Sequence, residues 1–274
     1  MRHSPSHPVS SHIGTWLLIF SCLSTGPVVA DDGTRFQVTP AKVSLVGNFS
    51  RLQLVVSELT KGTSPTDRSN DLTRAVRYTS LNPGVVGVTP SGELQARHNG
   101  TARVEVRTAG DGGQVQLVEV TVSGLVDNPA IGFREQVGPI LSKHGCNSGS
   151  CHAAQYGKGG FKLSVFGFDP GRDRTAIVRE RHQRRVSLVS PRNSLFLRKP
   201  TMKIPHGGGH RLDGDSIDHE ILVAWLLSGA PAPSSKAPKV TLLEVFPKRR
   251  VCEVGAQQQL QVIAHYSDKT SRDV

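Results

Sequence analysis

The clearest structural pattern in the sequence is YTSLNPGVVGVTPSGELQARHNGTARVEV, from Tyr78 to Val106. Apolar and polar residues alternate in it at a period of two, and turn-forming residues interrupt it at 82–84, 91–92 and 99–100. Alternation of this period is typical of strands with one buried face, and Asn-Gly or Ser-Gly pairs are typical of tight turns. The stretch therefore predicts a series of short antiparallel strands.

The same pattern extends outward over residues 36–124. Valine-rich runs such as FQVTPAKVSLVG and VQLVEVTVSG flank the central stretch, and turn signals recur about every ten residues. About seven strands at this spacing predict an Ig-like sandwich of two sheets.

A resemblance sharpens this prediction. The pattern S-x-N-P-x-V at residues 80–85, followed by G-x-L-x-A-x-x-x-G-T-A at residues 92–102, resembles the bacterial Ig-like domain of group 2. The resemblance implies that Tyr78 and Leu94 belong to the core and that Gly92 and Gly100 occupy turns.

The C-terminal residues 241–274 begin the pattern again. Pro247, Gly255 and Leu260 follow one another much as Pro40, Gly47 and Leu52 do near the start. We interpret them as the truncated start of a second Ig-like domain, in which Cys252 is a buried strand residue. Half a sandwich cannot bury its own face.

Residues 127–233 differ in character. An amphipathic helix is predicted from FREQVGPILSKHG, and another from SIDHEILVAWLLSGAP, with Ser216 or Asp215 as N-cap and Gly229 as its end. A Pro-rich linker follows at residues 234–240. We expect a compact domain between the two helices.

The run HGCNSGSCH lies inside this domain and predicts haem attachment. Covalent haem c needs two thiols for its vinyl groups and a His directly after the second thiol. Cys146, Cys151 and His152 supply these groups, although four residues separate the cysteines where two are usual. The intervening residues are small, and Gly149 allows a tight loop.

The surroundings of the motif resemble the planctomycete-type cytochrome c domain over roughly residues 130–232. The resemblance rests on HGCNSGSCHAAQYGKGGFKLSVFGFDP, on PHGGG and on the closing W-x-x-x-G-A-P helix. It implies one covalent haem c, an all-α fold around it, His152 as proximal iron ligand, and electron transfer or redox sensing.

The distal iron ligand is expected in the loop KPTMKIPHGGGHRL. Met202, His206 and His210 are candidates there, and an open sixth position is a further alternative. We prefer His206, with Met202 as the main alternative, because related modules carry a ligating Met near that place relative to Trp225.

Two other readings of the motif stay open. Cys146 and Cys151 could form a disulfide, or the motif with His144 could bind zinc. We expect His144, His182 and His219 to be surface residues, and no hydrolase motif is present.

Composition bears on location and partners. The first 30 residues read as a signal peptide, with an apolar run from Ile13 to Leu23 and a small-residue cleavage site at residues 28–30. We therefore expect export to the periplasm or cell surface.

The formal net charge is +11, but the basic residues are scattered apart from residues 179–185 and 248–250. Without interleaved aromatics they do not indicate nucleic acid. Redox partner proteins, acidic ones among them, and cell-envelope polysaccharide are the expected partners.

The fold class expected is multidomain: an all-β Ig-like sandwich, a small all-α cytochrome c-like domain, and a truncated second β-sandwich. The leading hypothesis is an exported monohaem electron carrier or redox sensor with Ig-like spacer domains, rather than an enzyme. The alternative is a surface adhesion or polysaccharide-binding protein in which haem is mainly structural.

Overall fold

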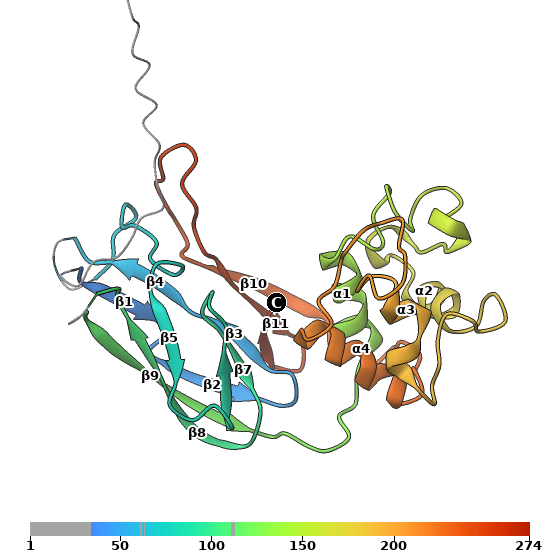
Figure 1. The fold of residues 1–274 in the computed structure, drawn as a ribbon, viewed down its shortest axis with the longest axis horizontal. Coiled ribbons are helices and arrows are strands. Elements are labelled where there is room, and N and C mark those ends of the chain that lie inside the picture. The colour runs from blue at the N-terminus through green and yellow to red at the C-terminus, as the bar shows by residue number, and fades with distance from the viewer. Residues whose placement is uncertain (1–33, 61, 63, 111–112) are drawn as a thin grey trace, which may run out of the picture.

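The computed structural model describes residues 34–60, 62, 64–110 and 113–274. Within them, twelve strands in four sheets accompany four short α-helices (Figure 1). The expected signal peptide at residues 1–30 lies outside the described residues.

The N-terminal part consists of strands. They are β1 (Phe36–Thr39), β2 (Lys42–Val46), β3 (Arg51–Gln53), β4 (Val55–Glu58), β5 (Arg77–Ser80), β6 (Val86–Val88), β7 (Glu93–Ala96), β8 (Gly100–Arg107) and β9 (Val115–Ser123). Three of the sheets are built from them, with strand orders β2-β9-β8-β5, β3-β7-β6 and β1-β4. The alternation of the sequence decides which side chains face inward: along β8 and β9, every second residue is buried.

The core between these sheets is almost entirely aliphatic, with Val104, Val118 and Leu94 fully buried. Tyr78 packs at its margin and donates its hydroxyl to the carbonyl oxygen of Thr73 at 2.9 Å. Gly92 has a φ of +82°, and a Cβ there would lie 2.7 Å from the Tyr78 hydroxyl. This turn therefore requires glycine both for its backbone conformation and for the space that Tyr78 occupies.

The helical part follows in residues 133–227. Its α-helices are α1 (Gly138–Lys143), α2 (Pro170–Val178), α3 (Leu195–Arg198) and α4 (Ile217–Leu227), and a π-helical turn, Phe133–Val137, precedes α1. Ser216 caps α4, because its hydroxyl accepts a hydrogen bond from the His219 amide at 3.2 Å. Trp225 of α4 is fully buried and meets Phe133 edge-on, with ring centres 5.5 Å apart.

The expected small all-α cytochrome c-like domain is wrong. The four α-helices have 6, 9, 4 and 11 residues, and turns and irregular backbone connect them. The physical reason is the glycine content of the segment after the motif: Gly157, Gly159 and Gly160 all have positive φ, which an α-helix does not accommodate. The chain as a whole has a mixed, sheet-rich fold.

The expected truncated second sandwich is also wrong. β10 (Val240–Phe246), β11 (Gln261–Tyr266) and β12 (Ser271–Asp273) form one three-stranded antiparallel sheet. Three strands cannot enclose a core of their own, and most of β10 is exposed. The sheet instead joins the N-terminal part, because the Asp273 carboxylate accepts a hydrogen bond from the Gln53 amide of β3, and the Gln53 carbonyl accepts one from Gln261.

Figure 1 shows the helical part beside the β-sheets, with β10 and β11 between them. Phe49, in the loop between β2 and β3, packs against the apolar core of the helical part. The two parts are therefore in direct contact through side chains.

Candidate site around His152 and His206

The loop of the two cysteines is a compact series of turns that begins where α1 ends. Gly145 leaves the helix with a φ of +70°. The Cys146 amide then donates to the Leu141 carbonyl at 2.8 Å, and the His152 amide donates to the Cys146 carbonyl at 3.0 Å. This last bond closes the loop, so the four residues between the cysteines fold back and bring His152 beside Cys146.

Both cysteines are free and half-buried. Burial raises the pKa of Cys146 to about 11, with a smaller contribution from the neighbouring Cys151. Cys146 is therefore a neutral thiol at ordinary pH.

The ring of His152 is held by the backbone that follows the motif. Its Nδ1 lies 3.0 Å from the Phe161 carbonyl oxygen. A carbonyl oxygen can only accept, so Nδ1 carries the proton and the neutral ring keeps its lone pair on Nε2. Burial lowers the pKa of His152; the carbonyls of Phe161 and Lys158 oppose this, and the charge of His206 lowers the pKa further.

His206 is oriented in the same way. Its Nδ1 lies 2.8 Å from the Gly209 carbonyl oxygen, so Nδ1 again donates and the lone pair of the neutral ring lies on Nε2. A Cβ at residue 208 would lie 2.8 Å from Cε1 of His206. Glycine at 208 therefore lets the backbone pass directly beneath the imidazole.

The two rings face one another across 6.4 Å between their centres, with an angle of 25° between their planes. They come from loops 54 residues apart in the chain. Two imidazoles that bind one metal ion through Nε2 have ring centres about 6 Å apart, because each metal–nitrogen bond is about 2 Å long. The separation of the ring centres matches that of two His ligands on one haem iron, and Cys146 and Cys151 lie in the loop of His152. To bind iron, the pair must also turn the Nε2 edges of both rings toward it, because the lone pair lies in the ring plane.

Exposed aromatic side chains follow the motif in the sequence. Tyr156, Phe166 and Phe168 are 80%, 71% and 91% exposed. Large exposed apolar patches often mark binding sites.

The other candidate distal ligands, Met202 and His210, belong to the same loop as His206. Met202 is exposed and has a left-handed backbone conformation with a φ of +57°. His210 is exposed and lies 3.4 Å from the Asp213 carboxylate.

One functional cluster was missed by sequence reasoning. The buried carboxylate of Asp218 on α4 binds Arg51 of β3 at 2.7 Å, His144 at 3.0 Å and Lys143 at 3.1 Å. Burial alone raises the pKa of Asp218, but the hydrogen bond of His144 and the charges of Arg51 and Lys143 outweigh it and hold this pKa well below its usual range. We call these four residues the Asp218 cluster.

The cluster corrects two expectations for histidines. His144 is not a free surface residue, since its Nε2 is engaged by Asp218 rather than turned toward the cysteines. His219 is buried, at 2% exposed, and burial lowers its pKa. The zinc interpretation loses its first ligand as a result, and the described residues hold no group of three or more His, Cys, Asp or Glu placed to bind a metal ion.

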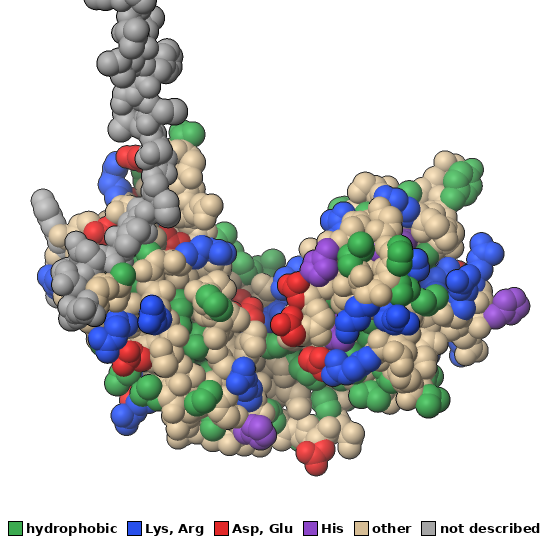
Figure 2. All heavy atoms as spheres, viewed as in Figure 1, with side chains coloured by type: hydrophobic (Ala, Val, Ile, Leu, Met, Phe, Trp, Pro, Cys, Tyr) green, Lys and Arg blue, Asp and Glu red, His purple; other side chains and the backbone are tan. Residues whose placement is uncertain are grey.

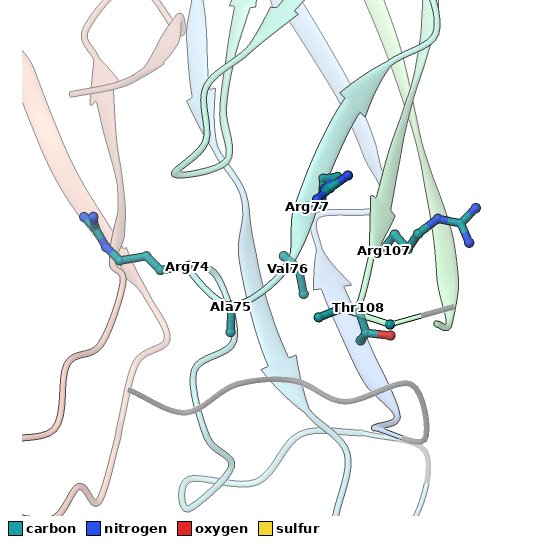
Figure 3. A pocket seen from close by; sticks show the side chains of 8 residues that line it. Arg74, Ala75, Val76, Arg77, Arg107 and Thr108 are labelled. Carbon is teal, nitrogen blue, oxygen red and sulfur yellow. The ribbon is translucent and has the colours of Figure 1, made fainter. Parts of the chain in front are cut away.

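Two cavities lie away from the histidine pair. The first, about 540 Å³, is bordered by Arg74, Arg77 and Arg107, but Figure 3 shows these side chains pointing in three different directions, so they do not converge on a ligand. The second, about 520 Å³, lies at the junction of the β-sheets, the helical part and the C-terminal sheet, beside Arg51 and Lys143.

Comparison with known proteins adds little. No protein-family model matches the chain, and no curated protein matches it. One similar solved structure is that of a protein described as a candidate alpha-galactosidase from Bacteroides fragilis, 10% identical, with a TM-score of 0.23. The match covers 43% of this chain and 25% of that one, so the chain spans about a quarter of its length. A match with a TM-score this low carries no information about the fold or function of this chain.

Among the described residues, no helix has the length and apolar character needed to cross a membrane.

Proposed function

We propose that this chain carries one covalently attached haem c and functions as an exported electron carrier or redox sensor. Cys146 and Cys151 would hold the haem through thioether bonds, and His152 and His206 would bind its iron. When bound, such a group supplies reversible one-electron chemistry that no amino-acid side chain here provides. The proposal needs neither an all-α fold nor membership of a known cytochrome family.

The observation that carries the proposal is the matched pair of imidazoles. Each ring is fixed by its Nδ1–H bond to a backbone carbonyl, at Phe161 and at Gly209. Such a bond selects the tautomer with a lone pair on Nε2, orients the ring and increases the basicity of that nitrogen. The ring centres lie 6.4 Å apart, a separation that supports binding of one metal ion by both imidazoles.

The two histidines would also determine whether a substrate can bind to the iron. Two His ligands favour six-coordinate iron, which leaves no open position for a substrate. They also favour a lower potential than a His and a Met, because a thioether stabilises reduced iron. We therefore infer transfer of electrons rather than catalysis.

The test is production of the full chain in a host with haem-attachment machinery, followed by intact mass and absorption spectra. We expect one covalent haem, lost in Cys146→Ala/Cys151→Ala, and a low-spin six-coordinate spectrum in the oxidised and reduced states. His206→Ala should become high-spin while keeping its covalent haem. Met202→Ala is the matched control and should retain the low-spin spectrum.

Absence of covalent haem in the wild-type chain would contradict the proposal. A charge-transfer band of thioether-ligated iron that disappears in Met202→Ala would transfer the distal role to Met202. Retention of the low-spin spectrum by His206→Ala would exclude His206.

Export is part of the same proposal. If residues 1–30 are a signal peptide, the secreted protein begins at Asp31. N-terminal sequencing of the mature product tests this, and an intact N-terminus in the cytosol would contradict it.

A further inference from the structure

The excess of positive over negative charge is confined to one region of the sequence. Residues 143–211 carry 14 Lys and Arg against three Asp and Glu, whereas the rest of the chain is balanced, with 19 of each. The whole formal net charge of +11 therefore belongs to the quarter of the sequence that contains both His152 and His206. Figure 2 shows Lys and Arg side chains over both the β-sheets and the helical part, and acidic side chains mainly over the β-sheets and the boundary between the two parts.

Four of these cations lie directly at the loops of the histidine pair. Lys162 donates to the carbonyls of Ala153 and Ala154, Arg185 to Gly160, Lys199 to Pro205, and Arg211 to Gly208. We call Lys162, Arg185, Lys199 and Arg211 the cationic collar. Its members are anchored on both loops, 153–160 and 205–208, so the collar spans the two sides of the pair.

The collar is held mainly by uncharged groups. A carbonyl fixes the position of an ammonium or guanidinium group without cancelling its charge, whereas a carboxylate would neutralise it. Within the described residues, one collar member meets a carboxylate: Arg185, whose Nη1 lies 3.5 Å from Glu180. The side chain of Arg185 is 11% exposed, so the docking contacts fall to Lys162, Lys199 and Arg211. Arg185 also stacks on Phe161 at 4.5 Å. The charge around the histidine pair is thus preorganised and largely uncompensated.

We propose that the collar docks an acidic protein over the histidine pair. Arg presents a planar fork that matches carboxylates, and Arg and exposed aromatics are the residues most enriched at protein interfaces. The exposed rings of Tyr156 and Phe168 in the same region supply the apolar contacts such an interface needs. Clustered carboxylates on the partner would steer it to this face and speed its arrival.

The inference rests on the proposed function in one respect: a partner that exchanges electrons with the site is a protein rather than a lipid surface. The docking itself does not require haem. Binding to an acidic probe and redox chemistry can therefore be measured separately.

The binding experiment uses fluorescent poly-L-glutamate and the full chain, with anisotropy recorded as salt increases. In Lys162→Glu/Lys199→Glu/Arg211→Glu we expect affinity at least tenfold below wild type. The matched control is Arg68→Glu/Arg77→Glu/Arg103→Glu, which changes the net charge equally on the β-sheets and should bind within twofold of wild type. A neutral version, Lys162→Gln/Lys199→Gln/Arg211→Gln, should show an intermediate loss and guards against misfolding of the reversal variant.

Equal weakening by the two charge-reversal variants would overturn the proposal, because net charge alone would then explain the binding. Vesicles of phosphatidylglycerol form a second arm. Strong binding to vesicles with none to polyglutamate would replace the protein partner by an anionic membrane.

The redox arm applies to the haem-loaded chain. Its oxidation by ferricyanide, an anion, should slow as salt increases, whereas oxidation by a cationic cobalt complex should accelerate. The collar reversal should diminish both trends. A chain that never loads haem contradicts the proposed function but leaves the polyglutamate result to decide the docking proposal.

Discussion

At the scale of single residues, hydrogen bonds decide which side chains are available for chemistry. His152 and His206 each donate from Nδ1 to a carbonyl, which leaves Nε2 as the electron-pair donor. His144 has its ring engaged by a buried carboxylate instead. His152 and His206 therefore have a nitrogen free to bind a metal ion, whereas the Nε2 of His144 is already engaged. The hydrogen-bond partner of each ring explains this difference.

The thiols differ as well, and this is testable in haem-free protein. Burial raises the pKa of Cys146 to about 11. Cys252 is not the buried strand residue that was expected, because it is exposed and lies outside the strands. At pH 8 we expect iodoacetamide to modify Cys252 first and Cys146 last. Cys146 should react about a hundredfold more slowly in the folded chain than in urea, since each pKa unit reduces the thiolate tenfold.

Mass spectrometry of tryptic peptides after timed quenching gives the three rates. Urea should bring the rates of Cys146 and Cys252 close together. A folded-state rate for Cys146 equal to that of Cys252 would contradict the burial of its thiol.

The haem role of Cys146, Cys151, His152 and His206 stays a prediction. These residues were chosen from local patterns, namely two thiols with a His directly after the second and the PHGGG loop. Asp218 could not be recognised, since its partner Arg51 lies 167 residues away and nothing local marks either residue. His219 was expected at the surface because a polar residue near a helix start usually faces solvent, but the packing of α4 buries it.

At the scale of elements, the Asp218 cluster connects three of them. Arg51 comes from β3, Lys143 and His144 from the end of α1, and Asp218 from the first turn of α4. A carboxylate in the first turn is also stabilised by the helix dipole. The cluster therefore fixes the start of the cysteine loop relative to both α4 and the β-sheets.

Removal of the Asp218 carboxylate should lower the stability of the folded chain. In Asp218→Ala three cationic groups lose their common partner, so we expect a loss of about 3–5 kcal/mol in the free energy of unfolding. Asp213→Ala is the matched control: its carboxylate is exposed and meets His210 at 3.4 Å, so the loss should stay below about 1 kcal/mol. Urea titration followed by circular dichroism measures both. Equal midpoints for the two variants would show that the cluster contributes no net stability.

Acid should act on the same cluster. Because the pKa of Asp218 is below its usual range in the folded chain, its contribution is fully present above the unfolded-state value and is lost as pH falls through the folded value. We expect the difference in stability between wild type and Asp218→Asn to shrink as the pH falls below about 4. Urea midpoints across this range test the sign, and a difference that grows toward acid would contradict it.

The elements themselves were predictable where the pattern was periodic. Strands β1 to β9 lie within the alternating runs, since a period of two leaves little choice of conformation once one face is buried. The helical island was overestimated, because amphipathic helices were recognised at its two ends and assumed between them. Glycines with positive φ at 157, 159 and 160 break the chain there into turns.

At the scale of the whole molecule, the β-sheets are attached to the helical part rather than spaced from it. Phe49 packs into the helical core, Arg51 binds Asp218, and Gln53 joins the C-terminal sheet. All three lie within five residues around β3. Residues 49–53 therefore connect the N-terminal β-sheets with the helical part and with the C-terminal sheet. No local sequence pattern predicts this arrangement.

This arrangement predicts cooperative unfolding of a chain that begins at Asp31. Trp225, in the helical core, is the single tryptophan of residues 31–274, so fluorescence reports that core, whereas the far-ultraviolet dichroism reports the backbone of all parts together. In wild type the two signals should change at the same urea concentration. In Phe49→Ala/Arg51→Ala the fluorescence transition should move to lower urea and separate from the dichroism, because the helical part loses both its packing partner and its buried ion pair. Arg103→Ala, an exposed change on β8, should leave the two transitions coincident.

Separate transitions in the wild-type chain would mean that the β-sheets and the helical part unfold independently. Coincident transitions in Phe49→Ala/Arg51→Ala would mean that these two residues do not couple the β-sheets to the helical part.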